Sequence, residues 1–155
     1  MQTGHVVDDF ELPDQHGNSR RLSEFLATGP VVLFFYPAAM TRGCTKEGCH
    51  FRDLRAEFEE LGAHRVGISA DAVDKQREFS EMHGFDYPLL SDPDRRVAEA
   101  LGVRRMLRVL GPNRRTTYVI DTESTILGVI DSQTNMNVHA DEAIALLRRR
   151  RATAS

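Results

Sequence analysis

The sequence predicts an α/β fold, in which a central mixed β-sheet is flanked by helices and carries an antiparallel edge. Apolar runs of strand length alternate with segments of helical periodicity through the middle of the chain, and two apolar runs lie side by side near its end. Such alternation indicates parallel strands joined by helices, whereas strands that follow each other directly pair antiparallel. The chain has 155 residues, the length of one domain, so we expect a single domain over residues 1–155.

The first half of the chain contains four predicted elements. Residues 10–25 have turn-forming residues at their centre and predict a β-hairpin. Residues 31–36, VVLFFY, are continuously apolar, as expected for a strand buried on both faces. From residue 43 to 61, apolar side chains recur at helical spacing, which predicts one amphipathic helix ending at Gly62. Residues 65–70 predict a second apolar strand.

The second half continues the alternation and then ends with two strands and a helix. In chain order we expect a helix over residues 72–84, an extended strand over 87–92, a helix over 94–103, strands over 116–121 and 125–131, and a helix over about 138–150. Asp71 is placed to cap the first of these helices. The two late strands are joined by a four-residue turn, which suits an antiparallel pair. Residues 148–155 are expected to form a frayed basic tail.

Composition excludes several classes of function. The chain is 41% hydrophobic and 28% charged with a net charge of −3, which is typical of a soluble globular protein without a basic field for nucleic acid. The N-terminal stretch lacks the apolar core of a secretory signal, and the longest apolar run is too short to span a membrane. Two cysteines without an export signal favour a reducing cytoplasm. We therefore expect a cytoplasmic protein that binds neither nucleic acid nor a membrane.

Cys44 is the predicted nucleophile of the chain. It follows the loop 37–43, which lies beyond the carboxyl end of a predicted strand, where such sheets bind ligands. At a helix start, unpaired N–H groups and a partial positive charge favour a thiolate over a thiol. Thr41 can direct a hydroxyl toward the same pocket, and Pro37 restrains the backbone as it leaves the strand. Buried free cysteines are most often inert packing, but Gly43 and the helix start argue against that here.

Cys49 lies five residues later on the same predicted helix. In a helix, such positions differ by roughly 7.5 Å of rise and have Cα atoms roughly 8.6 Å apart, beyond the limit of about 7 Å for a disulfide. The two sulfur atoms can join only if the first helical turns unravel, and Gly48 favours this. The spacing suits a two-step cycle, in which an oxidant converts Cys44 to a sulfenic acid and Cys49 then forms a disulfide with it. An external dithiol must reduce that disulfide.

Metal binding has little support in the sequence. His50 lies beside Cys49, but the remaining histidines form no pair at helical ligand spacing. We therefore expect no metal and no other cofactor.

The segment around Cys44 resembles the active-site signature of the peroxiredoxins. In that signature a proline, a threonine or serine and the reactive cysteine are spaced as Pro37, Thr41 and Cys44 are here, and a glutamate follows at the position of Glu47. The stretch CTKEGC followed by FRDL is similar to the peroxiredoxin Q group, also called bacterioferritin comigratory protein. In this group the resolving cysteine lies five residues after the first, as Cys49 does. The likeness runs from DFELPDQ near the start to RTTYVID.

The resemblance implies a fold and an activity. It implies a thioredoxin-like fold with an N-terminal β-hairpin extension, in a protein that is a monomer or a weak homodimer. It implies a thiol-dependent peroxidase that reduces hydrogen peroxide and organic hydroperoxides. A thioredoxin or glutaredoxin-type reductant is expected to recycle the enzyme.

The resemblance also assigns roles to single residues. The Thr41 hydroxyl and the backbone N–H of Cys44 would hold the peroxide. RTTYVID resembles the strand that begins with an arginine that stabilises the thiolate, which selects Arg115, and leaves Arg114 as a solvated cation. Glu47 would orient Arg115 through a hydrogen bond. Preorganised donors of this kind are a usual source of large rate effects.

The chain departs from the group at two positions. Arg42–Gly43 stands where the group usually has Pro-Gly, which places a charge near the thiolate or in solvent. Gly48 stands where alanine is common, so we expect easier fraying of the helix.

Two other hypotheses compete with a peroxidase. A redox sensor or disulfide oxidoreductase would pass oxidation to another protein, but the absence of CxxC argues against it. A binding module would use the basic tail, residues 146–155, in which Arg148–Arg151 could contact an anionic surface. A helix C-terminus with cations that complement its dipole is the simpler explanation of this tail. Residues 103–113 are a further candidate for a pocket wall or a partner contact.

Overall fold

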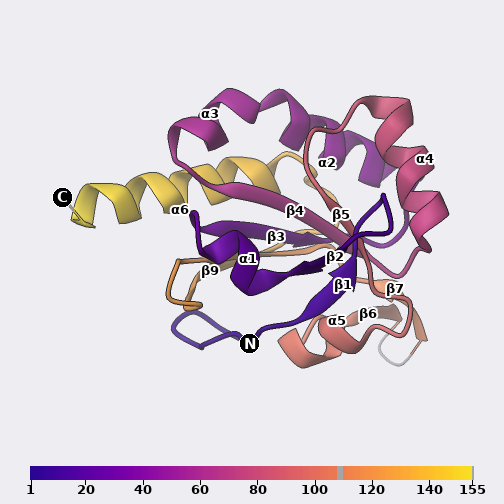
Figure 1. The fold of residues 1–155 in the computed structure, drawn as a ribbon, viewed down its shortest axis with the longest axis horizontal. Helices are drawn as coiled ribbons and strands as arrows, with labels where there is room; N and C mark the ends of the chain where they lie inside the picture. Colours follow the sequence, from indigo (N-terminus) through magenta and orange to yellow (C-terminus); the bar gives the residue numbers. More distant parts are fainter. Residues whose placement is uncertain (108–109, 155) are drawn as a thin grey trace.

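The structure, a computed structural model, describes residues 1–107 and 110–154. The strands of its main sheet are β3 (Val31–Phe35), β4 (His64–Ser69), β5 (Leu89–Ser91), β8 (Thr116–Ile120) and β9 (Ile126–Asp131). They lie in the order β5–β4–β3–β8–β9 (Figure 1). Strand β3 runs parallel to β4 and antiparallel to β8, and β8 pairs antiparallel with β9. The predicted mixed sheet with an antiparallel flank is confirmed.

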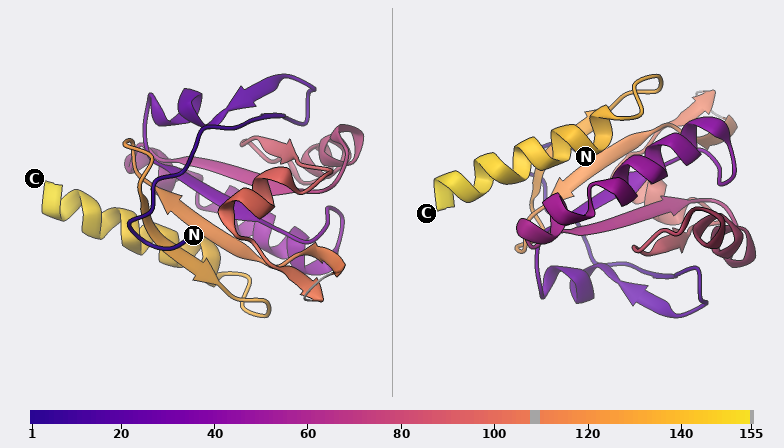
Figure 2. Two further views of the ribbon diagram at one scale, coloured as in Figure 1. Left: turned by 90° about the horizontal axis from the view of Figure 1, so that it is seen from below. Right: turned by 90° about the horizontal axis from the view of Figure 1, so that it is seen from above.

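Helices cover both faces of this sheet. They are α1 (Leu22–Leu26), α2 (Arg42–Asp53), α3 (Arg55–Glu60), α4 (Val73–His83), α5 (Arg96–Leu101) and α6 (Val138–Ala154). Alternate residues of β3 point to opposite layers, since side chains alternate along a strand. Leu33 and Phe35 pack with residues of α1 and α5, whereas Val32 and Phe34 pack with residues of α2, α3, α4 and α6. Figure 2 shows α2 and α6 side by side over the second face, where they contact each other.

The N-terminal hairpin is shorter than predicted. Strands β1 (Glu11–Pro13) and β2 (Ser19–Arg21) pair antiparallel, and helix α1 begins directly after them. Residues 22–25 are therefore helical and not part of the hairpin. The physical reason is burial: Leu22, Phe25 and Leu26 are spaced as neighbours on one helix face, and all three enter the core.

The helix predicted from residue 43 to 61 is broken in two. Helix α2 ends at Asp53 and α3 begins at Arg55, with Leu54 between them at φ −93° and ψ 19°. Beside the break, the guanidinium of Arg65 donates a hydrogen bond of 2.9 Å to the Phe51 carbonyl. A contact from strand β4 thus takes part in ending α2. The sequence of the helix itself does not contain this information.

Asp71 does not cap the helix that follows it. Helix α4 begins after Ala72, and no side chain caps its N-terminus. The Asp71 carboxylate instead accepts hydrogen bonds from the backbone N–H of Ala39 at 2.7 Å and from the hydroxyl of Ser69 at 2.6 Å. Asp71 therefore ties the loop after β3 to the end of β4, which fixes the backbone just before α2.

Two further differences lie in the last third of the chain. Strands β6 (Arg105–Leu107) and β7 (Leu110–Asn113) form an unpredicted antiparallel hairpin, and residues 108–109 of the 103–113 segment lie outside the described residues. Helix α6 continues to Ala154, so the described part of the basic tail is helical and not frayed. Its alanines and arginines are good helix formers, and Arg151 donates a hydrogen bond of 2.8 Å to the Glu60 carbonyl. No helix in the described ranges is both long and apolar enough to cross a membrane.

Candidate active site

Helix α2 presents Cys44 at its first turn. Strand β3 ends at Phe35, and Pro37 lies half-buried in the loop that turns toward the helix. Thr41 is the N-cap residue, and Cys44 is the third residue of α2 and only 2% exposed. The thiol is therefore close to the positive end of the helix and shielded from water. Of these two conditions, the position at the helix start is the one that favours a nucleophilic cysteine.

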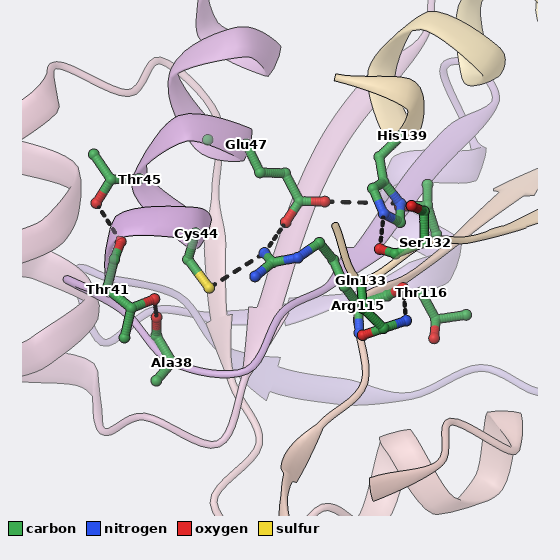
Figure 3. A network of polar contacts seen from close by, with 12 residues as sticks. Ala38, Thr41, Cys44, Thr45, Glu47, Arg115, Thr116, Ser132, Gln133 and His139 are labelled. Carbon is green, nitrogen blue, oxygen red and sulfur yellow. Dashed lines mark hydrogen bonds and ion pairs between the residues drawn. The ribbon is translucent and has the colours of Figure 1, made fainter. Parts of the chain in front are cut away.

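The Thr41 side chain is held by the loop and not by the helix. Its hydroxyl donates a hydrogen bond of 2.8 Å to the Ala38 carbonyl, and it makes no capping bond to α2 (Figure 3). The Thr41 carbonyl accepts a hydrogen bond from the Thr45 hydroxyl at 2.7 Å. Because the Thr41 hydroxyl donates its proton to the Ala38 carbonyl, its exposed oxygen can accept a hydrogen bond from a ligand.

Arg115 connects Cys44 to Glu47. It directly precedes strand β8, is 5% exposed, and places its Nη1 atom 3.3 Å from Cys44 Sγ and 2.8 Å from Glu47 Oε1. Burial lowers the pKa of Arg115, but Glu47 and Cys44 outweigh it and raise that pKa overall. The guanidinium is thus a permanent cation at the thiol. The sequence expectation named these three residues, and the structure brings them together (Figure 3).

Gln133 and Gly43 position Arg115. The Gln133 amide accepts a hydrogen bond from the Arg115 N–H at 2.7 Å and donates one of 3.2 Å to its carbonyl, so it clamps the backbone where β8 starts. A Cβ atom at Gly43 would lie 2.9 Å from Arg115 Nη2 and 3.2 Å from Met136 Cε. Glycine at this position leaves the space that the guanidinium occupies.

Glu47 is fully buried one turn after Cys44. Burial raises the pKa of Glu47 to about 7, and the nearby Arg115 only partly opposes this. Its Oε1 atom accepts the bond from Arg115, whereas Oε2 has no hydrogen-bond partner among the described residues. The group closest to Oε2 in an ion-pair geometry is His139 Nδ1, at 3.7 Å.

Sequence reasoning missed His139, Gln133 and Thr117. His139 is fully buried at the start of α6, where its ring bonds to the Thr117 hydroxyl and the Ser132 carbonyl, both at 2.8 Å. One signal was present: His139 lies beside Ala140 and four residues before Ala143, on what becomes the buried side of the helix. A histidine at the edge of an apolar stripe indicates a buried polar contact. A search for histidine pairs alone does not find it.

Cys49 lies on α2 away from Cys44, and both cysteines are free. Burial raises the pKa of the Cys49 thiol, although Arg52 opposes the effect. The segment between the cysteines is held by Tyr87, whose hydroxyl donates a hydrogen bond of 2.7 Å to the Gly48 carbonyl. A Cβ atom at Gly48 would lie 2.6 Å from Phe85 Cζ. Close packing with Phe85 therefore accounts for glycine here, in addition to the weaker helix that the sequence predicted.

The other candidate residues lie outside this cluster. Arg114 is 35% exposed and pairs with Asp131 at 3.5 Å, whereas Arg42 is exposed to solvent. His50 pairs with Asp141 at 2.8 Å. Among the residues that the structure describes, no group of histidines, cysteines and carboxylates is arranged to hold a metal ion.

Comparisons with known proteins identify the family of the chain. Residues 3–129 match the model of the AhpC/TSA family. A putative peroxiredoxin of Mycobacterium tuberculosis is 61% identical over 149 residues, which cover 96% of this chain and 97% of the relative. Among solved structures, peroxidoxin BcpB from Mycobacterium tuberculosis superposes with a TM-score of 0.91 at 61% identity, covering 96% of this chain and 97% of that one. A bacterioferritin comigratory protein of Xanthomonas campestris has a TM-score of 0.82 at 30% identity over 91% of both chains.

Proposed function

Because the chain belongs to the AhpC/TSA family of peroxiredoxins, we propose that Cys44 is its peroxidatic cysteine and Cys49 its resolving cysteine. The family membership makes the protein a thiol-dependent peroxidase with a thioredoxin-like α/β fold, and it does not favour a redox sensor or a nucleic-acid-binding module. The single observation that carries the residue assignment is the contact of 3.3 Å between Arg115 Nη1 and Cys44 Sγ, both of which are buried side chains.

The first step is a nucleophilic displacement on the peroxide. The Cys44 thiolate attacks the hydroxyl oxygen of ROOH, so an S–O bond forms while the O–O bond breaks. Cys44 becomes a sulfenic acid, and the departing RO⁻ takes up a proton to give the alcohol, or water when the substrate is hydrogen peroxide. Arg115 stabilises the thiolate before the attack and the negative charge on the oxygen during it.

One hydrogen-bond donor and one acceptor at the start of α2 would hold the peroxide. The backbone N–H of Cys44 belongs to the first turn of the helix and can donate to a peroxide oxygen. The Thr41 hydroxyl donates to the Ala38 carbonyl, so its oxygen can accept a hydrogen bond from the peroxide O–H. Pro37 and Asp71 support these groups from behind, because they constrain the loop that leads to α2.

The second step requires α2 to open. In the helix, the spacing of the two cysteines keeps their Cα atoms roughly 8.6 Å apart, too far for a disulfide. After local unwinding, the Cys49 thiolate attacks the Cys44 sulfur, an S–S bond forms, and the hydroxide that leaves becomes water on protonation. A thioredoxin-type dithiol would then reduce the disulfide. Each turnover of the cycle must return both cysteines to free thiols. A reducing cytoplasm suits this, because it keeps thiols reduced.

Peroxides are the substrates that the family implies. The relative from Xanthomonas campestris is described by its alkyl peroxide reduction activity. We therefore include organic hydroperoxides beside hydrogen peroxide in the proposed substrate range.

The test is stopped-flow oxidation with several peroxides, followed by mass analysis. We expect Cys44→Ser to abolish turnover, and Cys49→Ser to allow one round of oxidation without an intramolecular disulfide. Arg115→Lys should slow oxidation by about 100-fold, since removing one preorganised donor commonly costs this much. Arg114→Lys is the matched control and should react normally, because Arg114 pairs with Asp131 away from the thiol. Undiminished turnover in Cys44→Ser would overturn the assignment.

A further inference from the structure

A buried histidine lies behind the proposed catalytic residues. His139 comes from the first turn of α6 and reaches the Glu47 carboxylate from the side opposite to Cys44 (Figure 3). Both side chains are completely buried. The peroxidase cycle described above uses neither His139 nor the free oxygen of Glu47. Buried ionisable groups are costly unless their charge or their proton has a partner, so this arrangement requires an explanation.

The contacts of His139 determine where its proton lies. Its Nε2 atom is 2.8 Å from the Ser132 carbonyl, which can only accept, so Nε2 carries a hydrogen. Its Nδ1 atom is 2.8 Å from the Thr117 hydroxyl and 3.7 Å from Glu47 Oε2. In the neutral ring, Nδ1 has a lone pair and Thr117 donates to it. The same nitrogen lies beside Glu47 Oε2, which has no hydrogen-bond partner among the described residues.

His139 Nδ1 and Glu47 Oε2 can together bind one proton. With no proton on either atom, the negative charge of a buried carboxylate has no partner at Oε2, which is unfavourable. A proton on Glu47 removes this charge, and a proton on His139 places a positive ring 3.7 Å from it. The Thr117 hydroxyl can rotate and accept from Nδ1 when the proton lies on the ring.

We propose that His139 is a positioning residue of the peroxidase site, which shares one proton with Glu47 and thereby sets the charge that Arg115 meets. This inference rests on the proposed role of Cys44. When the pair holds its proton as Glu47–H and neutral His139, Arg115 faces a single anion, the Cys44 thiolate. When the proton leaves, the positive charge of Arg115 is shared between the thiolate and the Glu47 carboxylate. The proton therefore strengthens the hold of Arg115 on the thiolate.

Because of burial, the pair gains or loses this proton in the neutral pH range. Burial raises the pKa of Glu47 to about 7 and lowers the pKa of His139 below its usual value, so both charged forms are disfavoured. The titratable and charged groups around the pair are Arg115, Cys44, Asp131 and Tyr87, together with the pair formed by His50 and Asp141 between α2 and α6. Of these, Arg115 is the cation in direct contact with Glu47.

The test compares the pH dependence of Cys44 alkylation in full-length variants that also carry Cys49→Ser. We expect the parent to show an inflection near neutral pH from the shared proton, beside the ionisation of Cys44 itself. Glu47→Gln removes the inflection and moves the midpoint of alkylation to lower pH, because Arg115 then faces the thiolate alone. His139→Gln, which keeps a donor for Ser132, shifts the inflection to lower pH, because the pair loses one of the two sites that its proton can occupy.

A matched control and a direct measurement make the test decisive. His50→Gln alters another histidine between α2 and α6 and should leave the profile unchanged. In the wild-type protein, the ¹⁵N signal of His139 Nδ1 should titrate with the same midpoint as the ¹³C signal of the Glu47 carboxyl. An unmoved inflection in a folded His139→Gln variant, or a constant His139 signal while Glu47 titrates, would overturn the inference. Failure of the proposed function would instead appear as peroxide turnover in Cys44→Ser.

Discussion

Tyr87 holds the segment that the proposed cycle must open, so Tyr87→Phe should speed disulfide formation. Its hydroxyl donates a hydrogen bond of 2.7 Å to the carbonyl of Gly48, between the two cysteines. Tyr87 is 4% exposed, so water does not readily replace this bond in the closed helix. When Cys44 and Cys49 approach each other, Gly48 must move and the bond must break.

The size of the effect follows from the strength of one buried hydrogen bond. Such a bond contributes about 1 kcal/mol net, which corresponds to a factor of about five in an equilibrium constant. Phenylalanine keeps the ring and its stacking on Phe85 at 5.2 Å, so the packing of this region is retained. If opening precedes the chemistry as a rapid equilibrium, the disulfide should form about five times faster. Oxidation of Cys44 should keep its rate.

The assay is a single-turnover experiment. The reduced enzyme is mixed with one equivalent of hydrogen peroxide, quenched at intervals with an alkylating reagent, and analysed by mass for sulfenic acid and disulfide. Faster resolution should also leave less sulfenic acid exposed to further oxidation by excess peroxide.

Tyr118→Phe is the matched control. Tyr118 is also buried, and its hydroxyl donates a hydrogen bond of 2.9 Å to the Leu101 carbonyl, in the layer that contains α5. The substitution deletes the same type of bond far from α2 and should not change the rate of disulfide formation. An unchanged rate in Tyr87→Phe, or equal acceleration in both variants, would refute the reasoning. Equal acceleration would point to a loss of global stability instead of local opening.

Three further substitutions test the packing and charge of the site. Gly43→Ala should slow Cys44 oxidation by about 10- to 100-fold in stopped flow, because its methyl group displaces Arg115 and small misplacements of this kind are costly; a normal rate would contradict the steric argument. Gly48→Ala should lower the free energy of unfolding by about 1 kcal/mol in denaturant titrations, since the clash with Phe85 costs more than the better helix propensity returns; a more stable variant would show that propensity dominates. Burial raises the pKa of Glu47 from 4.5 to about 7, so its contribution to stability is present below pH 4.5 and is lost as the pH rises through 7. Relative to Glu47→Gln, the wild type should therefore lose about 3 kcal/mol across that range, and a constant difference between the two proteins would mean that the pKa is not raised.

Local patterns account for the parts of the fold that the sequence predicts well. The run VVLFF forms β3, because only a strand with neighbours on both sides and helices on both faces can bury every one of its residues. The late strands pair across their four-residue turn for an equally local reason. The order of motifs also places Cys44 at a helix start. A strand, a short loop and a segment of helical periodicity follow each other there, so the helix must begin close to Cys44.

Other features depend on partners that are distant in sequence, and periodicity cannot reveal them. Helix α2 ends where Arg65 reaches the Phe51 carbonyl, and Asp71 holds Ala39 instead of capping α4. His139 lies 92 positions after Glu47 in the printed sequence, and only the packing of α6 on α2 brings the two together.

The sequence by itself determined the sheet, the helix that carries Cys44 and Cys49, and the resemblance that singles out Arg115. These features arise from backbone propensities and from motifs within a few residues, which act before the chain is packed. The tertiary structure alone decided which oxygen of Glu47 lacks a partner, why Gly43 and Gly48 have no side chain, and where α2 stops. These depend on distances between α2, β8 and α6, and such distances exist only once burial has brought the elements into contact.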